Sequence, residues 1–346
     1  LAITFPFMNL AAAFGAAVGI GASTTISVKL GQKDYQTAEN ILGNTITLNL
    51  IVGLTFAGVC LLFLDPILRF FGASDATLPY AHDFMHTILL GNVFSHMYFG
   101  MNAVLRAASK PKKAMCATIF TVVMNILLDV VFIRWWHWGI KGAALATIIS
   151  QTLALCWQMT LFANKNELLH LKRGIYKLKA NLVKNIISIG ISPFLMNACA
   201  CVIVIFINNQ LVRFGGDMSV GAYGIGNSIA MIFVMSVIGL NQGMQPIAGY
   251  NYGAQQYERM MRVVKLSIIT ATCIMLTGWS LAMFVPYHCV RLFTTNPELI
   301  KRSINALHII MMMFPLIGCQ MVITNFFQCI GKVKISIFLS LSRQLL

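Results

Sequence analysis

The sequence predicts an all-α membrane protein that crosses the bilayer many times. Of its 346 residues, 58% are hydrophobic and only 10% are charged, whereas a soluble domain carries roughly 25% charged residues. The hydrophobic residues gather in runs that approach the roughly 20 residues a helix needs to cross a bilayer. Because backbone groups in lipid must find their hydrogen bonds within the span, each run is expected to be a helix.

Turn and charge signals divide these runs and predict nine spans and the start of a tenth near residue 335. The chain starts and stops inside hydrophobic runs and lacks an initiator methionine, so we expect it to be a fragment of a longer protein. The boundaries follow the apolar runs to within a few residues. The expected spans are 3–30, 41–64, 83–105, 114–133, 141–163, 185–212, 220–250, 264–285 and 303–330.

The positive residues predict the orientation of the spans. Most of the 25 Lys and Arg residues fall in connections on one side of the bundle, including those at 106–113, 164–184 and 254–262. Short loops that retain Lys and Arg face the cytoplasm. The tryptophans of 135–138 lie at the opposite boundary, as an aromatic belt would. The net charge of +15 is therefore interpreted as a topology signal, and no nucleic-acid partner is expected.

The chain also repeats itself at a constant spacing. Gly31 pairs with Gly253 and Tyr35 with Tyr257, each 222 residues apart, and loops and spans keep this register without gaps. Six spans separate equivalent points, so the two halves enter the membrane in the same orientation. The sequence therefore predicts two pseudo-symmetric six-helix bundles, a parallel repeat that is incomplete at both ends.

The repeat and the charge pattern give the expected domain organisation. An N-terminal lobe that lacks its first helix covers 1–163, a cytoplasmic linker covers 164–184, and a truncated C-terminal lobe covers 185–346. The linker sequence is basic and amphipathic from Leu168 to Lys184. We expect it to lie along the anionic cytoplasmic lipid face while it joins the two halves.

One acidic residue lies well inside a span. Burying a carboxylate in lipid is costly, so Asp129 is a functional candidate. Asn125 stands four residues earlier on the same helical face, and Thr147 offers a hydroxyl on the next span. These oxygens suit a desolvated Na⁺, and a proton is the other candidate occupant. The alternative is an aspartate that only bonds neighbouring backbone or amide groups.

Other polar positions give weaker indications. Asn102, Asn197 and Gln242 are expected to be polar contacts in an otherwise apolar substrate cavity, with helix–helix hydrogen bonding as the alternative. His82 and His86 have the spacing of a helical metal pair, but they lie at a span end, where polar residues at the interface are favoured. No metal is expected beyond Na⁺ at Asp129.

Four stretches together resemble one transporter family. They are the run GLNQGMQPIAGYNYGA (239–254) followed by Arg259, the run GIGASTTISVKLG (19–31), LRAASKPK (105–112) and NILLD (125–129). The chain is similar over its whole length to the multidrug and toxic compound extrusion (MATE) family. The resemblance implies two six-helix lobes in a V around a central cavity, which export organic cations in exchange for Na⁺ or H⁺.

The resemblance also implies roles for particular residues. It carries Asn125, Asp129 and Thr147 over as the ion site of the N-terminal lobe. The family's first helix, which bears another acid, and the last one to two helices are absent from this chain. Because the spans 185–212 and 303–330 contain no acid, coupling is expected in the N-terminal lobe.

Two other function classes compete with an antiporter. A flippase for lipids or lipid-linked precursors predicts a strongly cationic cavity, and no cluster of Arg or Lys lies within the spans. An enzyme would need a paired acid and base at membrane depth, where the sequence has only one acid. We therefore expect a monomeric, multi-pass antiporter in the plasma membrane (the bacterial inner membrane). Its expected partners are a small-molecule substrate and membrane lipid, with no cofactor besides the coupling Na⁺ or H⁺.

Overall fold

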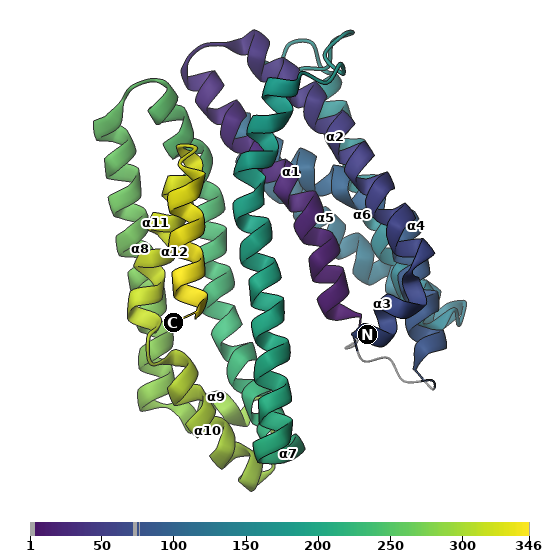
Figure 1. Ribbon diagram of the computed structural model, residues 1–346, viewed down its shortest axis with the longest axis vertical. Coiled ribbons are helices and arrows are strands. Elements are labelled where there is room, and N and C mark those ends of the chain that lie inside the picture. Colours follow the sequence, from purple (N-terminus) through teal and green to yellow (C-terminus); the bar gives the residue numbers. More distant parts are fainter. Residues whose placement is uncertain (1–3, 72–74, 76, 346) are drawn as a thin grey trace. The chain divides into compact units, whose positions relative to one another are not determined.

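The computed structural model describes residues 4–71, 75 and 77–345. This part of the chain is helical and contains no strand, which confirms the expected fold class (Figure 1). The helices are α1 (Phe5–Gly31), α2 (Tyr35–Leu62), α3 (Leu64–Phe70), α4 (Leu78–Ala107), α5 (Pro111–Asp129), η1 (Val130–Trp135), α6 (Gly139–Ala163), α7 (Ala180–Gly253), α8 (Tyr257–Phe284), α9 (Pro286–Arg291), α10 (Pro297–Met311), α11 (Phe314–Cys329) and α12 (Val333–Leu345).

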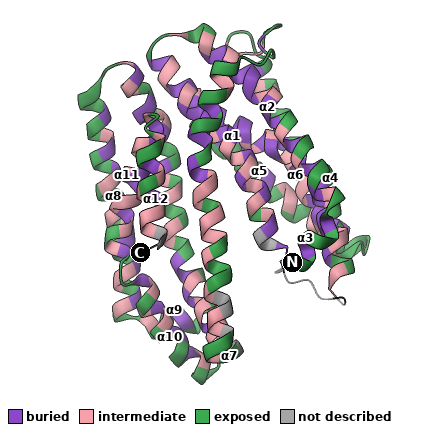
Figure 2. Cartoon of the chain, viewed as in Figure 1, coloured by how far each residue is buried: buried purple, intermediate pink, exposed green. Residues whose placement is uncertain are grey.

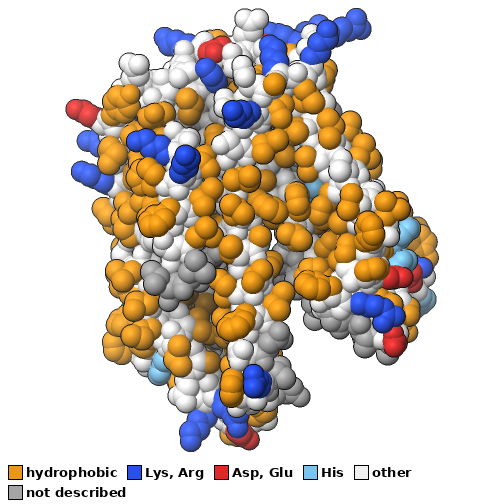
Figure 3. Space-filling view, in the orientation of Figure 1, with side chains coloured by type: hydrophobic (Ala, Val, Ile, Leu, Met, Phe, Trp, Pro, Cys, Tyr) orange, Lys and Arg blue, Asp and Glu red, His pale blue; other side chains and the backbone are white. Residues whose placement is uncertain are grey.

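The long helices match the expected membrane spans. Within the described residues, eight helices are long and apolar enough to cross a membrane, or nine if the bent pair α10 and α11 forms one span. Helix α7 contributes two of them, Ala180–Ile207 and Met218–Gly253, with a break at Gly216 (φ 64°, ψ −173°). Glycine tolerates this left-handed φ because it has no Cβ. In Figure 3 apolar side chains dominate the middle zone of the visible face, and Lys and Arg gather toward the two ends.

The helix boundaries repeat at the predicted spacing. Both ends of α8 (Tyr257–Phe284) lie 222 residues after the corresponding ends of α2 (Tyr35–Leu62). The turns that precede these helices repeat as well, since Lys33 and Gln255 have left-handed φ values of 60° and 58°. Two turns of the same unusual backbone conformation at the same offset are independent evidence for an internal duplication.

The two halves differ where a proline enters one of them. Helix α4 is continuous through Val93, whereas its counterpart divides into α10 and α11, which are bent by 45°. Pro315 lies in the first turn of α11, 222 residues after Val93. Proline lacks an N–H group and its ring clashes with the preceding turn, so this substitution accounts for the break.

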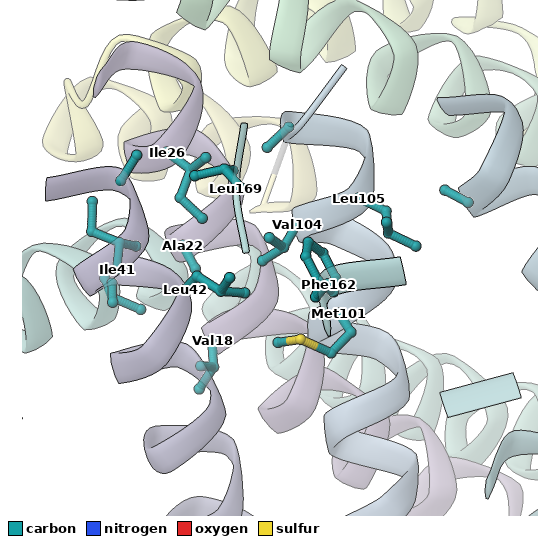
Figure 4. Packing of buried hydrophobic residues seen from close by; sticks show 14 of the residues in the cluster. Val18, Ala22, Ile26, Ile41, Leu42, Met101, Val104, Leu105, Phe162 and Leu169 are labelled. Carbon is teal, nitrogen blue, oxygen red and sulfur yellow. The ribbon is translucent and has the colours of Figure 1, made fainter. Parts of the chain in front are cut away.

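The chain packs as two compact units, Leu1–Asn197 and Ala198–Leu346. Buried residues lie on the faces that the helices of each unit turn toward one another (Figure 2). In the first unit, apolar side chains of α1, α2, α4 and α6 form one cluster, shown in Figure 4 with Ala22, Leu42, Met101 and Phe162 among its members. The second unit has its own cluster, built by α7, α8, α10 and α11.

Close backbone contact joins the beginning of α7 to the first unit. A Cβ at Gly21 of α1 would lie 2.0 Å from the carbonyl oxygen of Ile186, and one at Gly190 of α7 would lie 2.2 Å from that of Ala17. Small residues at such crossings let helix backbones approach closely in membranes. The first part of α7 is thus built into the N-terminal half of the protein.

The segment between α6 and α7 is irregular and partly buried in the first unit. Residues 164–179 form turns and irregular structure. Leu169 and Ile175 are buried (3% and 6% exposed), and Figure 4 shows Leu169 beside Ile26 in the core of the first unit. The linker packs on the first unit because these two apolar side chains are covered by protein and because α2 supplies hydrogen-bond partners to the linker backbone. Leu168, Tyr176 and Leu178 of the same stretch are exposed, and their contact with the lipid face stays a prediction.

Ion pairs fasten the first half of this linker segment to the first unit at two positions. Lys110 at the start of α5 is hydrogen-bonded to Glu167, and Lys113 lies 3.5 Å from the same carboxylate. The Lys110 ammonium holds the pKa of Glu167 below its usual range. Lys172 contacts the carboxylate of Glu39 on α2 at 2.7 Å. Because these contacts join the linker to the first unit, the linker packs as part of it.

Candidate functional site

Asp129 stands where the regular helix α5 ends and the wider π-helical segment η1 begins. The change of hydrogen-bonding pattern is visible at Trp136, whose N–H donates to the carbonyl of Val131, five residues earlier, at 3.0 Å. Segment η1 forms the end of the span Pro111–Trp135, so Asp129 lies at the junction between regular and π-helical backbone. The sequence did not predict this irregularity.

Asn125 and Thr147 are in contact, as the sequence predicted for residues of one polar site. The Asn125 amide Nδ2 donates a 3.4 Å hydrogen bond to Thr147 Oγ1, and the Thr147 hydroxyl donates to the carbonyl of Ala143 at 3.0 Å. This bond links α5 to α6. Both residues are half-buried.

The Asp129 carboxylate lies one turn further along α5 from Asn125. Its residue is half-buried, yet atom Oδ1 is buried and has no hydrogen-bond partner among the described residues. Among the described residues, no hydrogen bond joins the Asp129 carboxylate to Asn125 or Thr147. A buried carboxylate oxygen without a donor is unfavourable, and a bound cation or a proton would relieve that cost. The arrangement can therefore hold a hard cation or a proton.

Asn102, one of the three candidate cavity residues, has partners typical of a structural role. Asn102 is 6% exposed, donates to Ala114 O at 3.0 Å and to Thr118 Oγ1 at 3.3 Å, and accepts from the Arg106 guanidinium. These bonds join α4 to α5 and favour the helix–helix alternative for Asn102. Its role as a substrate contact stays a prediction.

The other two cavity candidates are exposed. Asn197 Nδ2 donates to the carbonyl of Pro193 at 2.8 Å within its own helix, and Gln242 is on the second span of α7. An exposed amide is available to a ligand, but no contact among the described residues shows that either amide lines a substrate cavity. Both stay predictions.

The histidine pair at the beginning of α4 is a stacked surface pair. The rings of His82 and His86 lie 5.7 Å apart between centroids, and His82 Nε2 is 3.8 Å from the Asp65 carboxylate. Among the described residues no three His, Cys, Asp or Glu side chains are grouped as metal ligands would be.

Sequence reasoning missed two polar groups in the first unit. Glu39, placed at a span end, is only 7% exposed and receives Lys172 and His170 from the linker, the latter at 3.6 Å. His96 of α4 is 1% exposed, and its Nε2 lies 2.9 Å from the carbonyl of Ala11. A polar residue inside an apolar run was the available signal for His96, whereas nothing in the sequence linked Glu39 to residues more than 130 positions away.

Comparison with known proteins gives one consistent family. The family model MatE matches residues 1–131 and 189–346. The multidrug export protein MepA of Staphylococcus haemolyticus (strain JCSC1435) is 29% identical over 332 residues, covering 96% of this chain and 73% of its own length. MepA of Staphylococcus aureus (strain NCTC 8325 / PS 47) is 27% identical with the same coverage.

Solved structures show the same fold. A multidrug resistance MATE family transporter of the MOP superfamily, in an outward-facing conformation, superposes with a TM-score of 0.93 at 24% identity, over 100% of this chain and 78% of its own. The MATE multidrug transporter DinF-BH gives a TM-score of 0.90 at 35% identity, over 99% of this chain and 77% of its own. With its many apolar helices, the chain is a multi-pass protein of the plasma membrane. It belongs to the multidrug and toxic compound extrusion (MATE) family of multidrug efflux transporters.

Proposed function

We propose that this protein is a secondary active antiporter that exports organic, cationic compounds in exchange for Na⁺ or H⁺ by alternating access. The observation that carries the proposal is the buried, unpartnered Oδ1 of Asp129 inside the span Pro111–Trp135. The names of the relatives support drug export, because the staphylococcal proteins are called multidrug export proteins. As a member of a transporter family, the chain is not an enzyme.

The proposed ion site consists of Asp129 with Asn125 and Thr147. The Asn125–Thr147 hydrogen bond of 3.4 Å holds α5 and α6 together beside the carboxylate. The amide and hydroxyl oxygens of these side chains add neutral ligands of the type that Na⁺ prefers. A proton would instead bind to the carboxylate alone, so loss of the neutral ligands should affect Na⁺ binding more than proton binding.

Antiport requires that the ion and the drug disfavour each other's binding, and such coupling is reciprocal. An ionised Asp129 attracts a cationic substrate, and occupation by Na⁺ or a proton removes that negative charge. Each gradient-driven ion that fills the site would thus promote substrate release. Four acids lie within the eight continuous spans of the described residues, and Asp129, six residues before the end of Pro111–Trp135, is the one furthest from a span end.

The test is transport by the full-length protein in proteoliposomes loaded with a fluorescent lipophilic cation. A Na⁺ gradient and a pH gradient are imposed separately, with an ionophore control that dissipates each one. We expect one of the two gradients to drive substrate movement against its concentration. Substrate movement that depends on neither gradient would contradict the antiport proposal.

A further inference from the structure

The linker docks on one face of the first half of α2, and the polar side chains of that face bind the linker backbone. Asn44 Nδ2 donates to the carbonyls of Ile175 (3.3 Å) and Lys177 (3.1 Å). Thr47 Oγ1 donates to the carbonyl of Tyr176 at 3.0 Å. Gly43, next to Asn44, leaves the space that this backbone needs, because a Cβ there would lie 2.4 Å from the carbonyl oxygen of Ile175.

The equivalent face of α8 is open in the described part of the chain. It carries a shallow, open hollow of about 550 Å³, and the described residues that line it all belong to α8. Its lining residues lie 222 positions after seven residues of α2. Among those seven, Glu39, Asn44 and Thr47 bond to the linker and Gly43 leaves room for it. The hollow is lined by Tyr257, Glu258, Met261, Arg262, Lys265, Leu266 and Ile269.

The residues that bind the linker on α2 are replaced on α8 by residues that cannot do so. Lys265 stands at the position of Gly43, where a Cβ would lie only 2.4 Å from the linker carbonyl of Ile175. Leu266 replaces Asn44, the amide that binds three linker backbone groups, so the hydrogen-bonding group is absent. The α8 face is thus unsuited to a peptide segment docked in the manner of the linker.

Its own chemistry is that of a site for an amphiphile with an acidic head. Arg262 and Lys265 are exposed within the first nine residues of α8, and Leu266 and Ile269 continue the hollow toward the middle of the span with 58% and 59% of their surface exposed. Glu258 is the one acid in the lining, and the two cations outweigh it. Long basic side chains attract anionic headgroups at the membrane surface, and apolar side chains of a span face acyl chains.

We propose that this hollow binds one anionic phospholipid, with its phosphate on Arg262 and Lys265 and an acyl chain along Leu266 and Ile269. The order of these residues along α8 fits a lipid whose headgroup lies at the cytoplasmic surface, the side to which the positive loops assign the start of α8. The site depends on the membrane location of α8 and is independent of the coupling ion.

The experiment uses the full-length protein in detergent with phosphatidylglycerol added at increasing concentration, and native mass spectrometry counts the retained lipid. The variant Arg262→Gln/Lys265→Gln is compared with Lys332→Gln/Lys334→Gln, which removes two exposed cations at the start of α12. At about fivefold for each cation near the surface, the first variant should bind roughly 25-fold more weakly. The control should bind as the wild type does.

Two further arms separate the lipid from other occupants. Phosphatidylcholine should bind the wild type weakly and equally in both variants, because its headgroup has no net charge. Soluble glycerol phosphate should not displace the lipid, since it has no acyl chain to lie along Leu266 and Ile269. Equal retention of phosphatidylglycerol by both variants, or displacement by glycerol phosphate at matched concentration, would overturn the proposal. Unchanged melting temperatures show that each variant is folded.

Discussion

Removing the Asn44 side chain should detach the linker from α2. The side chain is fully buried and binds three linker backbone groups: the carbonyls of Ile175 and Lys177, and the N–H of Lys179, which donates to Asn44 Oδ1 at 2.8 Å. The substitution Asn44→Ala leaves all three without this partner. The α2 helix itself should persist, since the residue lies in its interior and alanine favours helix.

The magnitude follows from which of the three groups can turn to water. Ile175 is buried, so leaving its carbonyl unpaired lowers the stability of the docked linker by about 1–3 kcal/mol. Lys177 and Lys179 are exposed, and water can replace their lost bonds, so each costs about 0.5–1.5 kcal/mol. The total of about 2–6 kcal/mol corresponds to an increase of at least about 30-fold in the population of detached linker.

Hydrogen–deuterium exchange of the full-length protein measures this population at the linker amides. The N–H of Leu171, bonded to the carbonyl of Phe162 at 2.9 Å, and that of Lys179 should exchange at least about 30-fold faster in Asn44→Ala. Asn40→Ala is the matched control, because the Asn40 amide donates only within its own helix, to Gln36 O. Equal exchange in both variants would refute the assigned role.

Three further predictions test packing, topology and the ion site. Gly21→Val forces a side chain against the carbonyl of Ile186, because even a Cβ at this position would lie 2.0 Å from that oxygen. The substitution should destabilise the protein by at least roughly 1–3 kcal/mol, measured as a lower melting temperature. A unique cysteine at Arg173 should resist an impermeant thiol reagent added outside intact cells and react in everted vesicles; labelling from outside would contradict the topology. Asn125→Ala and Thr147→Ala should raise the Na⁺ concentration for half-maximal export severalfold if Na⁺ is the coupling ion; unchanged values would remove both residues from the site.

The helical architecture was predictable because its signals are long and redundant. Apolar runs of about 20 residues define spans whatever their neighbours are, and the 222-residue repeat fixed matching turns at Gly31 and Gly253. The structure places helix ends at both of these residues. The break before Pro315 could also have been anticipated, because proline disrupts a helix, although the apolar run alone predicts one span over 303–330.

The linker and the local geometry of the site were beyond sequence reasoning for a physical reason. Basic and apolar residues alternate in the linker as they would on a lipid surface, and the choice between lipid and protein depends on α2, more than 120 positions away. Helical spacing placed Asn125 and Asp129 on one face, and Thr147 was assigned only to the next span, so the sequence did not specify the Asn125–Thr147 hydrogen bond. The π-helical turn after Asp129 depends on how η1 packs against α6 and leaves no sequence pattern of its own.

The most direct test of the account is gradient-driven export by the full-length Asp129→Asn protein. Asparagine keeps the size of the side chain and removes its charge, so ion occupancy can no longer change the charge of the site. Asp83→Asn is the control, because Asp83 lies at the beginning of α4 in an ion pair with Lys141 at 3.1 Å. At equal membrane levels, we expect Asp129→Asn to abolish export under the driving gradient and Asp83→Asn to retain it. Wild-type export rates in Asp129→Asn would contradict the central claim.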